Sequence, residues 1–126
     1  MERGAEFVDQ WRSMSSRYHE IACRLDRELE ESHGVSMNEF ETLDRLAAHD
    51  AEKLRMLDLA ASMYLSQSAL SRTVARLERA GLVERALCEA DRRGVFVRIT
   101  AEGLARYRVA SDTHRAILGE HLTTEG

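Results

Sequence analysis

Proline is absent from the 126-residue sequence, although average usage would place about six prolines in a chain of this length. Because proline interrupts helices, its absence predicts long continuous helices. Only two cysteines occur, Cys23 and Cys88, and they form neither a disulfide framework nor the spacing of a zinc site. We therefore expect a cytoplasmic protein in a reducing compartment, folded without disulfides.

Long apolar segments are also missing. No apolar run approaches the roughly 20 residues that span a bilayer, and residues 1–10 lack the apolar core of a signal peptide. The sequence has no glycine-rich phosphate loop, no nucleophile elbow and no H-E-x-x-H motif. None of the five histidines stands in an H-x-x-x-H pair. We expect no membrane contact, no enzymatic activity, no cofactor and no metal site.

The sequence that is present has the length of one domain and, with 44% hydrophobic and 32% charged residues, the composition of a soluble globular protein. Over its first quarter, apolar residues recur at spacings of one, three or four, which predicts a long amphipathic helix ending at Gly34. Ser36 and Glu39 form a capping box that opens a second helix. The apolar stripe of the first helix consists of Phe7, Val8, Trp11, Met14, Tyr18, Ile21, Ala22, Leu25 and Leu29.

The second half of the chain changes pattern twice. After a polar, loop-like segment at 49–55 come two short helices, at 57–63 and 67–80, joined by a tight turn. Alternation with a period of two then predicts strands over 82–88 and 95–100, joined by the polar loop 89–94. A final helix follows Thr100. The fold class is therefore mainly α with a small β-hairpin, in the order of a winged helix-turn-helix with long terminal helices.

The second helix of the helix-turn-helix carries residue types suited to DNA. Short polar side chains at a helix N-terminus let backbone N–H groups approach phosphates, and Gln and Arg read adenine and guanine in the major groove. The residues predicted to contact bases or phosphates are Ser66, Gln67, Ser68, Ser71, Arg72 and Arg76.

The hairpin that follows is the predicted wing, with Asp91, Arg92 and Arg93 at its tip. Arginines on a short loop fit a narrow minor groove, where the negative potential is strongest. Asp91 would be repelled by phosphate, so its predicted role is to orient a neighbouring arginine.

Charge is divided along the chain. Residues 66–98 hold seven basic and four acidic residues, a net charge of +3. The rest holds 11 basic and 18 acidic residues, a net charge of −7, so the overall −4 averages a basic segment and an acidic frame. The acidic total therefore does not exclude DNA as a partner.

Four motifs together resemble the MarR family of transcriptional regulators. They are the S-x-S-x-L-S-R run at 66–72, the V-x-R-L-E-x-x-G-L-V-x-R stretch at 74–85, D-R-R at 91–93 and I-T-x-x-G at 99–103. The resemblance covers nearly the whole chain. It implies a homodimer that represses genes from a near-palindromic operator in double-stranded DNA and releases it when a small phenolic or other aromatic compound binds.

The resemblance also implies a division of the chain: residues 1–34 form a dimerisation helix, 35–100 the DNA-binding domain and 101–126 a second dimerisation helix. Family members usually continue into a further C-terminal helix. Either the sequence is truncated, or dimerisation rests on two terminal helices.

Some residues carry two interpretations. Trp11 and Tyr18, with Met37 and Phe40, either pack in the core or dimer interface or line an aromatic effector pocket. Cys23 is either a small apolar side chain or a redox sensor, as in some members of the family. The alternatives for the whole chain are a redox- or metal-sensing regulator of the same fold, or a winged-helix protein-interaction module that does not bind DNA.

Overall fold

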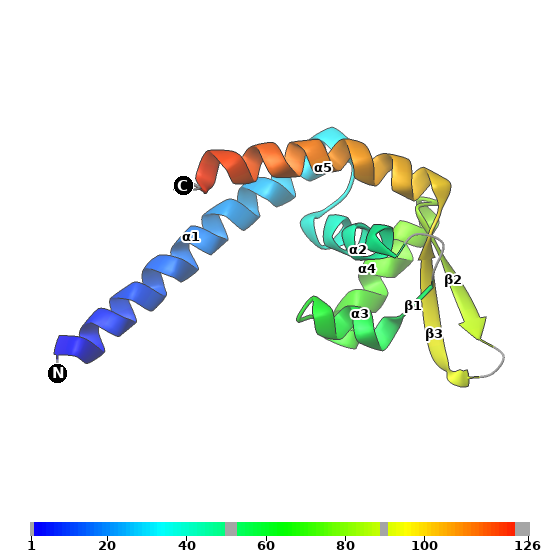
Figure 1. Ribbon diagram of the computed structural model, residues 1–126, viewed down its shortest axis with the longest axis horizontal. Coiled ribbons are helices and arrows are strands. Elements are labelled where there is room, and N and C mark those ends of the chain that lie inside the picture. The colour runs from blue at the N-terminus through cyan, green and yellow to red at the C-terminus, as the bar shows by residue number, and fades with distance from the viewer. Residues whose placement is uncertain (1, 50–52, 89–90, 123–126) are drawn as a thin grey trace.

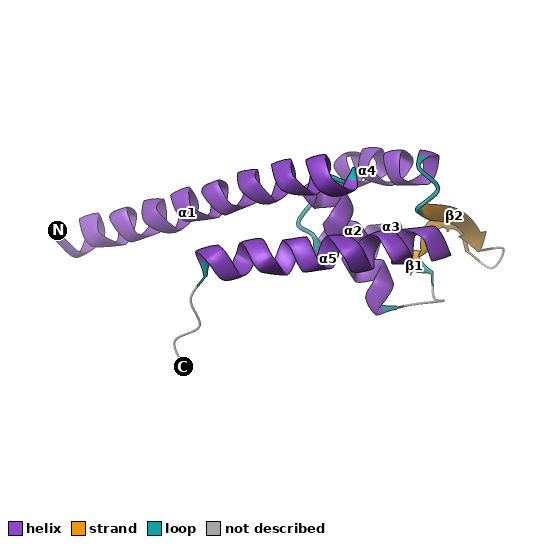
Figure 2. Ribbon diagram, turned by 90° about the horizontal axis from the view of Figure 1, so that it is seen from above, coloured by secondary structure: helices purple, strands orange, loops and turns teal. Residues whose placement is uncertain are grey.

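The computed structural model describes residues 2–49, 53–88 and 91–122, with only the backbone described for residues 2, 87, 88 and 91–94 (Figure 1). Two long helices, α1 and α5, lie side by side over part of their length, and a lobe of three shorter helices and a small sheet lies beneath α5 (Figures 1 and 2). The elements are α1 Glu2–His33, α2 Met37–Ala48, β1 Leu54–Arg55, α3 Met56–Ser62, α4 Gln67–Arg79, β2 Val83–Cys88, β3 Asp91–Ile99 and α5 Ala101–His121.

Local signals set most helix ends. Gly34 has a φ of +69° and its N–H donates to the carbonyl of Glu30, which ends α1 as predicted. The capping box of Ser36 and Glu39 is present at the start of α2. The side chain of Ser66 caps α4. The predicted helix boundaries are therefore confirmed to within one residue of the structure.

The core lies where α2 and α4 meet beneath α5 and the inner half of α1. Helix α4 faces it with Leu70, Val74 and Leu77, the stripe that its sequence predicts. The rest of this core comes from every other element, chiefly Leu25, Leu29, Val35, Phe40, Leu43, Leu46, Leu59, Leu82, Val97, Ala110 and Ile117. One continuous core therefore joins the terminal helices to the lobe.

The sheet differs from the prediction in two ways. The sequence predicts a loop over residues 49–55, whereas Leu54 and Arg55 form β1 and pair antiparallel with Val97 and Phe96 of β3, so the hairpin has a third strand. The loop predicted over residues 89–94 is also too long, because β3 begins at Asp91, which pairs with Cys88. A register shift after Leu87 accompanies this early pairing.

The first turn of α5 lies directly against the start of the wing. A Cβ atom at Gly103 would lie 2.0 Å from the carbonyl oxygen of Leu82, closer than any real contact. Only glycine allows the two backbones this approach. Thr100 reinforces the joint, because its side chain caps α5 and also donates a hydrogen bond to the carbonyl of Gly81.

The outer half of α1 extends away from the rest of the molecule (Figure 1). Its apolar side chains are bare: Phe7 is 65% exposed, Trp11 69% and Tyr18 64%. We call residues 7–18 the arm, and residues 21–33, which lie against α2 and α5, the packed half of α1. Among the helices of the described residues, none is long and apolar enough to cross a membrane.

Candidate nucleic-acid interface and adjoining pocket

The outer face of α4 carries the predicted base-reading residues. Because Leu70, Val74 and Leu77 turn inward, Gln67, Ser68 and Arg72 lie on the opposite side and are exposed to solvent. Ser66 caps the helix by accepting a hydrogen bond from the N–H of Ala69. The N-terminus of α4, with its partial positive charge, therefore lies among short polar side chains, an arrangement that suits a phosphate.

Arg72, near the middle of α4, is exposed to solvent. Arg72 has no hydrogen-bond or ion-pair partner among the described residues, so its guanidinium is available to an external group. Ser71 is half-buried, and its carbonyl accepts a hydrogen bond from Arg85, whose Nε lies 3.4 Å from Glu78. The first strand of the wing is thus tied to α4 beside the reading face.

Arg76 lies between two carboxylates. Its Nη2 is 3.5 Å from Glu30 of α1 and its Nε is 3.4 Å from Glu39 of α2, whose side chain is 5% exposed. Glu39 also accepts the N–H of Ser36 in the capping box. A phosphate contact by Arg76 stays a prediction, and it would have to compete with or add to these two ion pairs.

The wing lies on the same side of the lobe as α3, away from α5 (Figure 1). Its backbone is a twisted antiparallel pair of β2 and β3. The side chains of Asp91, Arg92 and Arg93 lie outside the described residues, so their predicted contacts with DNA and with one another stay predictions.

Two cations that the sequence pattern does not assign to the wing, Lys53 and Arg55, lie against Phe96 of β3. Lys53 Nζ lies 5.3 Å from the centre of the Phe96 ring, and the guanidinium carbon of Arg55 lies 5.6 Å from it. Both distances are those of cation–π contacts. The signal available in the sequence was a basic pair within a polar segment, but only the pairing of β1 with β3 brings it to the wing.

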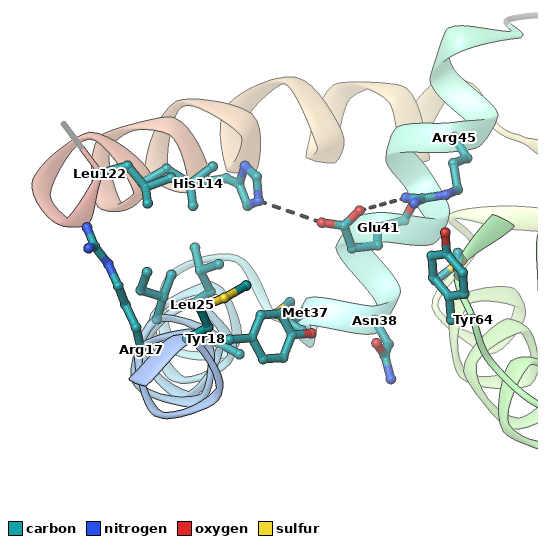
Figure 3. Close-up of a pocket in the computed structure, with 15 residues that line it drawn as sticks. Arg17, Tyr18, Leu25, Met37, Asn38, Glu41, Arg45, Tyr64, His114 and Leu122 are labelled. Carbon is teal, nitrogen blue, oxygen red and sulfur yellow. Dashed lines mark hydrogen bonds and ion pairs between the residues drawn. The ribbon is translucent and has the colours of Figure 1, made fainter. Parts of the chain in front are cut away.

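A pocket of about 610 Å³ lies between α1, α2, α5 and the turn that joins α3 to α4 (Figure 3). That volume is in the range of small-molecule sites. Its walls are mainly apolar, with Met37 at the start of α2 and Leu118 on α5, and its polar groups come from a few residues. The other apolar or aromatic residues around it are Met14, Tyr18, Ile21, Ala22, Leu25, Met63, Tyr64 and Leu122.

Of the four residues predicted for an effector pocket, the structure brings Tyr18 and Met37 together on its wall (Figure 3). Trp11 is not on the wall, because it lies two turns further out on the arm. Phe40 is also not on the wall: it is 2% exposed and stacks in the core between Tyr107 and His114, with ring centres 5.4 and 4.5 Å away. Trp11 and Phe40 therefore do not line this cavity, and an effector role for any of the four residues stays a prediction.

The stack on Phe40 is anchored by a charged hydrogen bond. The hydroxyl of Tyr107 donates a hydrogen bond to Asp44 at 2.5 Å. Because only the neutral hydroxyl can donate this bond, it raises the pKa of Tyr107 above the usual value of 10.0, and burial and the negative charge of Asp44 act in the same direction. This contact ties α5 to α2 beside the pocket.

The polar side of the pocket centres on Glu41. Its carboxylate lies 2.6 Å from Arg45 and 3.7 Å from His114, and all three residues line the pocket (Figure 3). Arg17, across the pocket on α1, donates a hydrogen bond to the carbonyl of His121. The lining contains two arginines, Arg17 and Arg45, and one carboxylate, Glu41, so the pocket has an excess of positive charge.

Tyr64 stands at the rim of the pocket, in the turn before α4. It is 96% exposed and has a φ of +56°, a left-handed conformation that is uncommon for a residue other than glycine. In Figure 3 its ring is seen on the other side of α2 from Tyr18, below Arg45.

Cys23, the candidate redox residue, is a free and exposed cysteine on α1. The nearest cation in sequence is Arg24. Arg24 is engaged by Glu28 and Glu120, and these carboxylates raise its own pKa. A redox role for Cys23 therefore stays a prediction.

The fold has counterparts among solved protein structures. A profile described as MarR family matches residues 33–94. No curated protein sequence matches the chain. Among solved structures, CouR from Rhodococcus jostii RHA1 bound to p-coumaroyl-CoA is 26% identical, with a TM-score of 0.78 over 90% of this chain and 78% of that one.

Two structures from Streptomyces coelicolor are more similar in sequence. AbsC, a MarR family transcriptional regulator, is 34% identical, with a TM-score of 0.83 over 91% of this chain and 77% of that one. Sco3205, a MarR family transcriptional regulator solved in complex with DNA, is 33% identical, with a TM-score of 0.87 over 94% of this chain and 74% of that one. The winged helix-turn-helix of α3, α4 and the β2–β3 wing thus has its counterparts among gene regulators, and the chain belongs to the MarR family of transcriptional regulators.

Proposed function

We propose that the chain is a cytoplasmic, ligand-responsive repressor that binds a specific near-palindromic operator in duplex DNA as a homodimer. The observation that carries the proposal is the exposed face of α4, where Gln67, Ser68 and Arg72 surround a capped helix N-terminus. These are the groups that contact phosphates and base edges in the major groove. The similarity to Sco3205, which was solved with DNA, supports the same use.

The exposed apolar residues of the arm are the evidence for the proposed homodimer. Phe7, Trp11 and Tyr18 expose a continuous apolar stripe, a surface that soluble proteins normally cover. We assign residues 1–34 and 101–126 to dimerisation and 35–100 to DNA binding. In such a dimer the two α4 helices would enter successive major grooves about 34 Å apart, which is why a near-palindrome is expected.

The pocket is the evidence for the proposed effector. Its apolar walls and excess positive charge suit a small aromatic or phenolic compound with an acidic group. The related CouR was solved with p-coumaroyl-CoA, an aromatic acyl thioester. Binding between the terminal helices and the lobe would change the position of α4 in the dimer, so the ligand would weaken DNA binding.

The test is a salt titration of binding to duplex DNA that flanks the protein's own gene. We expect the affinity to fall steeply and linearly with the logarithm of salt concentration, because each phosphate contact releases counterions. Arg72→Ala should cost about 1–3 kcal/mol and relax base specificity, whereas Arg93→Ala should weaken binding to most sequences.

Two alternatives are outcomes of the same assays. Binding that does not depend on salt, or no binding to any duplex, would favour a protein-interaction module. A redox regulator would lose DNA in the presence of peroxide and keep it in Cys23→Ser. If Arg93→Ala binds its operator as tightly as the unmodified protein, the wing has no role in DNA binding.

A further inference from the structure

Four polar side chains connect α5 to the end of α3 along one wall of the pocket. His114 Nε2 on α5 lies 3.7 Å from Glu41 of α2, and Glu41 lies 2.6 Å from Arg45 one turn further along α2. Arg45 in turn donates to Ser62, the last residue of α3. Figure 3 shows the first three of these side chains in line along the pocket. The chain of contacts reaches from a terminal helix to the helix-turn-helix.

Arg45 contacts both of its neighbours in this series, Glu41 and Ser62. Its Nη1 donates to the carboxylate of Glu41 at 2.6 Å and to the carbonyl of the same residue at 3.2 Å. Its Nε donates to the hydroxyl of Ser62 at 3.2 Å, and its Nη2 to the carbonyl of Ser62 at 3.4 Å. The guanidinium group has five N–H donors in a fixed plane, so it makes all these contacts only in one orientation. These contacts occupy four of its five N–H donors, so an acceptor in the pocket that takes the Nε–H must replace the hydroxyl of Ser62.

Ser62 lies at the start of a short connection to α4. Only Met63, Tyr64 and Leu65 separate it from Ser66, the cap of α4. The N–H groups of Tyr64 and Leu65 donate to the carbonyls of Ala61 and Ala60, so the turn is attached to the last turn of α3. A shift of Ser62 is therefore carried through the turn to the N-terminus of α4.

The contacts from Arg45 to Ser62 are the replaceable ones. They are longer than the ion pair with Glu41, and the hydroxyl of Ser62 already donates to the carbonyl of Leu59. A carboxylate or sulfonate in the pocket would accept charge-assisted hydrogen bonds from Nε and Nη2, which are roughly twice as strong as neutral ones. The apolar walls would hold an aromatic body beside it.

We propose that Arg45 is both the anion receptor of the pocket and the residue that couples the pocket to the recognition helix. An amphipathic aromatic anion takes the donors of Arg45 that now hold Ser62, releases the end of α3, and thereby lowers the affinity of α4 for DNA. This inference rests on the proposed function, since it concerns how the pocket acts on DNA binding. The coupling is reciprocal: DNA weakens binding of the anion by the same factor.

The experiment uses 8-anilinonaphthalene-1-sulfonate as the probe, since it joins an aromatic body to an acidic group. Its fluorescence measures occupancy of the pocket in the full chain without DNA, and the anisotropy of a labelled duplex measures DNA affinity with and without saturating probe. We expect Arg45→Gln to raise the dissociation constant of the probe about tenfold, the effect of losing one charge-assisted contact. Its DNA affinity should no longer respond to the probe.

Three further variants separate charge from coupling. Glu41→Gln should bind the probe more tightly, because the competing carboxylate is gone. Ser62→Ala, which is outside the pocket wall, should bind the probe at least as tightly as the unmodified protein but transmit less of its effect to DNA. Arg17→Gln is the matched control: it removes the other pocket arginine, whose hydrogen bond goes to His121 and not to the turn. Arg17→Gln should weaken binding of the probe, but a saturating concentration of the probe should still lower DNA affinity.

Failure of the inference and failure of the proposed function look different. If the unmodified protein does not bind the probe, or if Arg45→Gln binds it as tightly, Arg45 is not the receptor. If Ser62→Ala and Arg45→Gln respond to saturating probe as the unmodified protein does, the coupling through Arg45 is wrong.

Arg45→Lys, which keeps the charge but not the planar fork, should bind the probe, and its DNA affinity should respond only weakly to the probe. This variant covers the case in which Arg45→Gln does not fold. A protein that binds no duplex refutes the proposed function itself.

Discussion

Helix α1 contains two halves with the same sequence pattern and opposite surroundings. In the packed half, Leu25 and Leu29 are 5% and 0% exposed against α2 and α5. In the arm, Trp11 and Tyr18 continue the same apolar stripe, yet both are more than half exposed. Periodicity therefore predicts which side of a helix is to be covered, but not which molecule covers it. The packed half belongs to the fold of one chain, and the arm is the surface we assign to a second copy.

The largest effect is expected in the packed half. Leu29→Ala removes a fully buried side chain and leaves a cavity, so it should lower the free energy of unfolding by about 3 kcal/mol. Urea denaturation monitored by circular dichroism measures it. The loss should be the same at low and high protein concentration, whereas a loss that disappears at high concentration would mean that Leu29 acts through the dimer.

The next effect is expected in the arm. Trp11→Asp should raise the dissociation constant of the homodimer about hundredfold, because buried aromatic residues dominate interfaces and a carboxylate there would be desolvated. Sedimentation equilibrium gives the association constant, and circular dichroism should retain the helix content of the unmodified protein. If Trp11→Asp associates as tightly as the unmodified protein, the arm is not the interface.

A smaller effect concerns the support of the packed half. Helix α5 covers it and is tied to α2 by Tyr107 and Asp44. Because the hydrogen bond raises the pKa of Tyr107, its stabilisation is complete below the unfolded pKa of 10.0 and is lost as pH rises through the higher folded pKa. Tyr107→Phe should cost about 1 kcal/mol near neutral pH. The difference from the unmodified protein should shrink above about pH 10, and an equal difference at every pH would exclude this hydrogen bond as its cause.

The smallest effect is expected close to the boundary between the two halves. Arg24 joins α1 to α5 through Glu120 and contacts the ring of His121 at 3.1 Å, but its position is partly exposed. Ion pairs of this kind contribute little to stability, so Arg24→Gln should leave Tm unchanged within experimental error. Differential scanning calorimetry at low and high salt is the measurement. A clear fall in Tm at low salt would give the polar contacts of α1 more weight than its apolar ones.

The parts of the fold that the sequence predicts are those set by neighbouring residues. The cap at Ser36 depends on Glu39, three positions away, and the end of α1 depends on Gly34 itself. Strand β1 could not be predicted in this way. It has two residues, and its pairing partners, Val97 and Phe96, come more than 40 positions later.

The same limit applies to the candidate site. The exposed face of α4 follows from its period, but the ion pairs of Arg76 with Glu30 and Glu39 depend on how α1 and α2 pack against α4. Their aromatic rings alone suggest that Phe40 and Trp11 belong to one pocket, but Phe40 lies in the core and Trp11 on the arm, and neither lines the pocket. Contacts between distant segments are what a single sequence leaves open.

The joint at Gly103 has a mechanical consequence. Side chains normally form the contact between two elements, and they can rotate to absorb a small displacement. Here the backbone of α5 touches the backbone of Leu82, with no side chain between them, and Thr100 bonds to Gly81 across the same joint. A tilt of α5 must therefore turn the base of the wing with it. If α5 is part of the dimer, the angle between the two α5 helices sets the distance between the two wings.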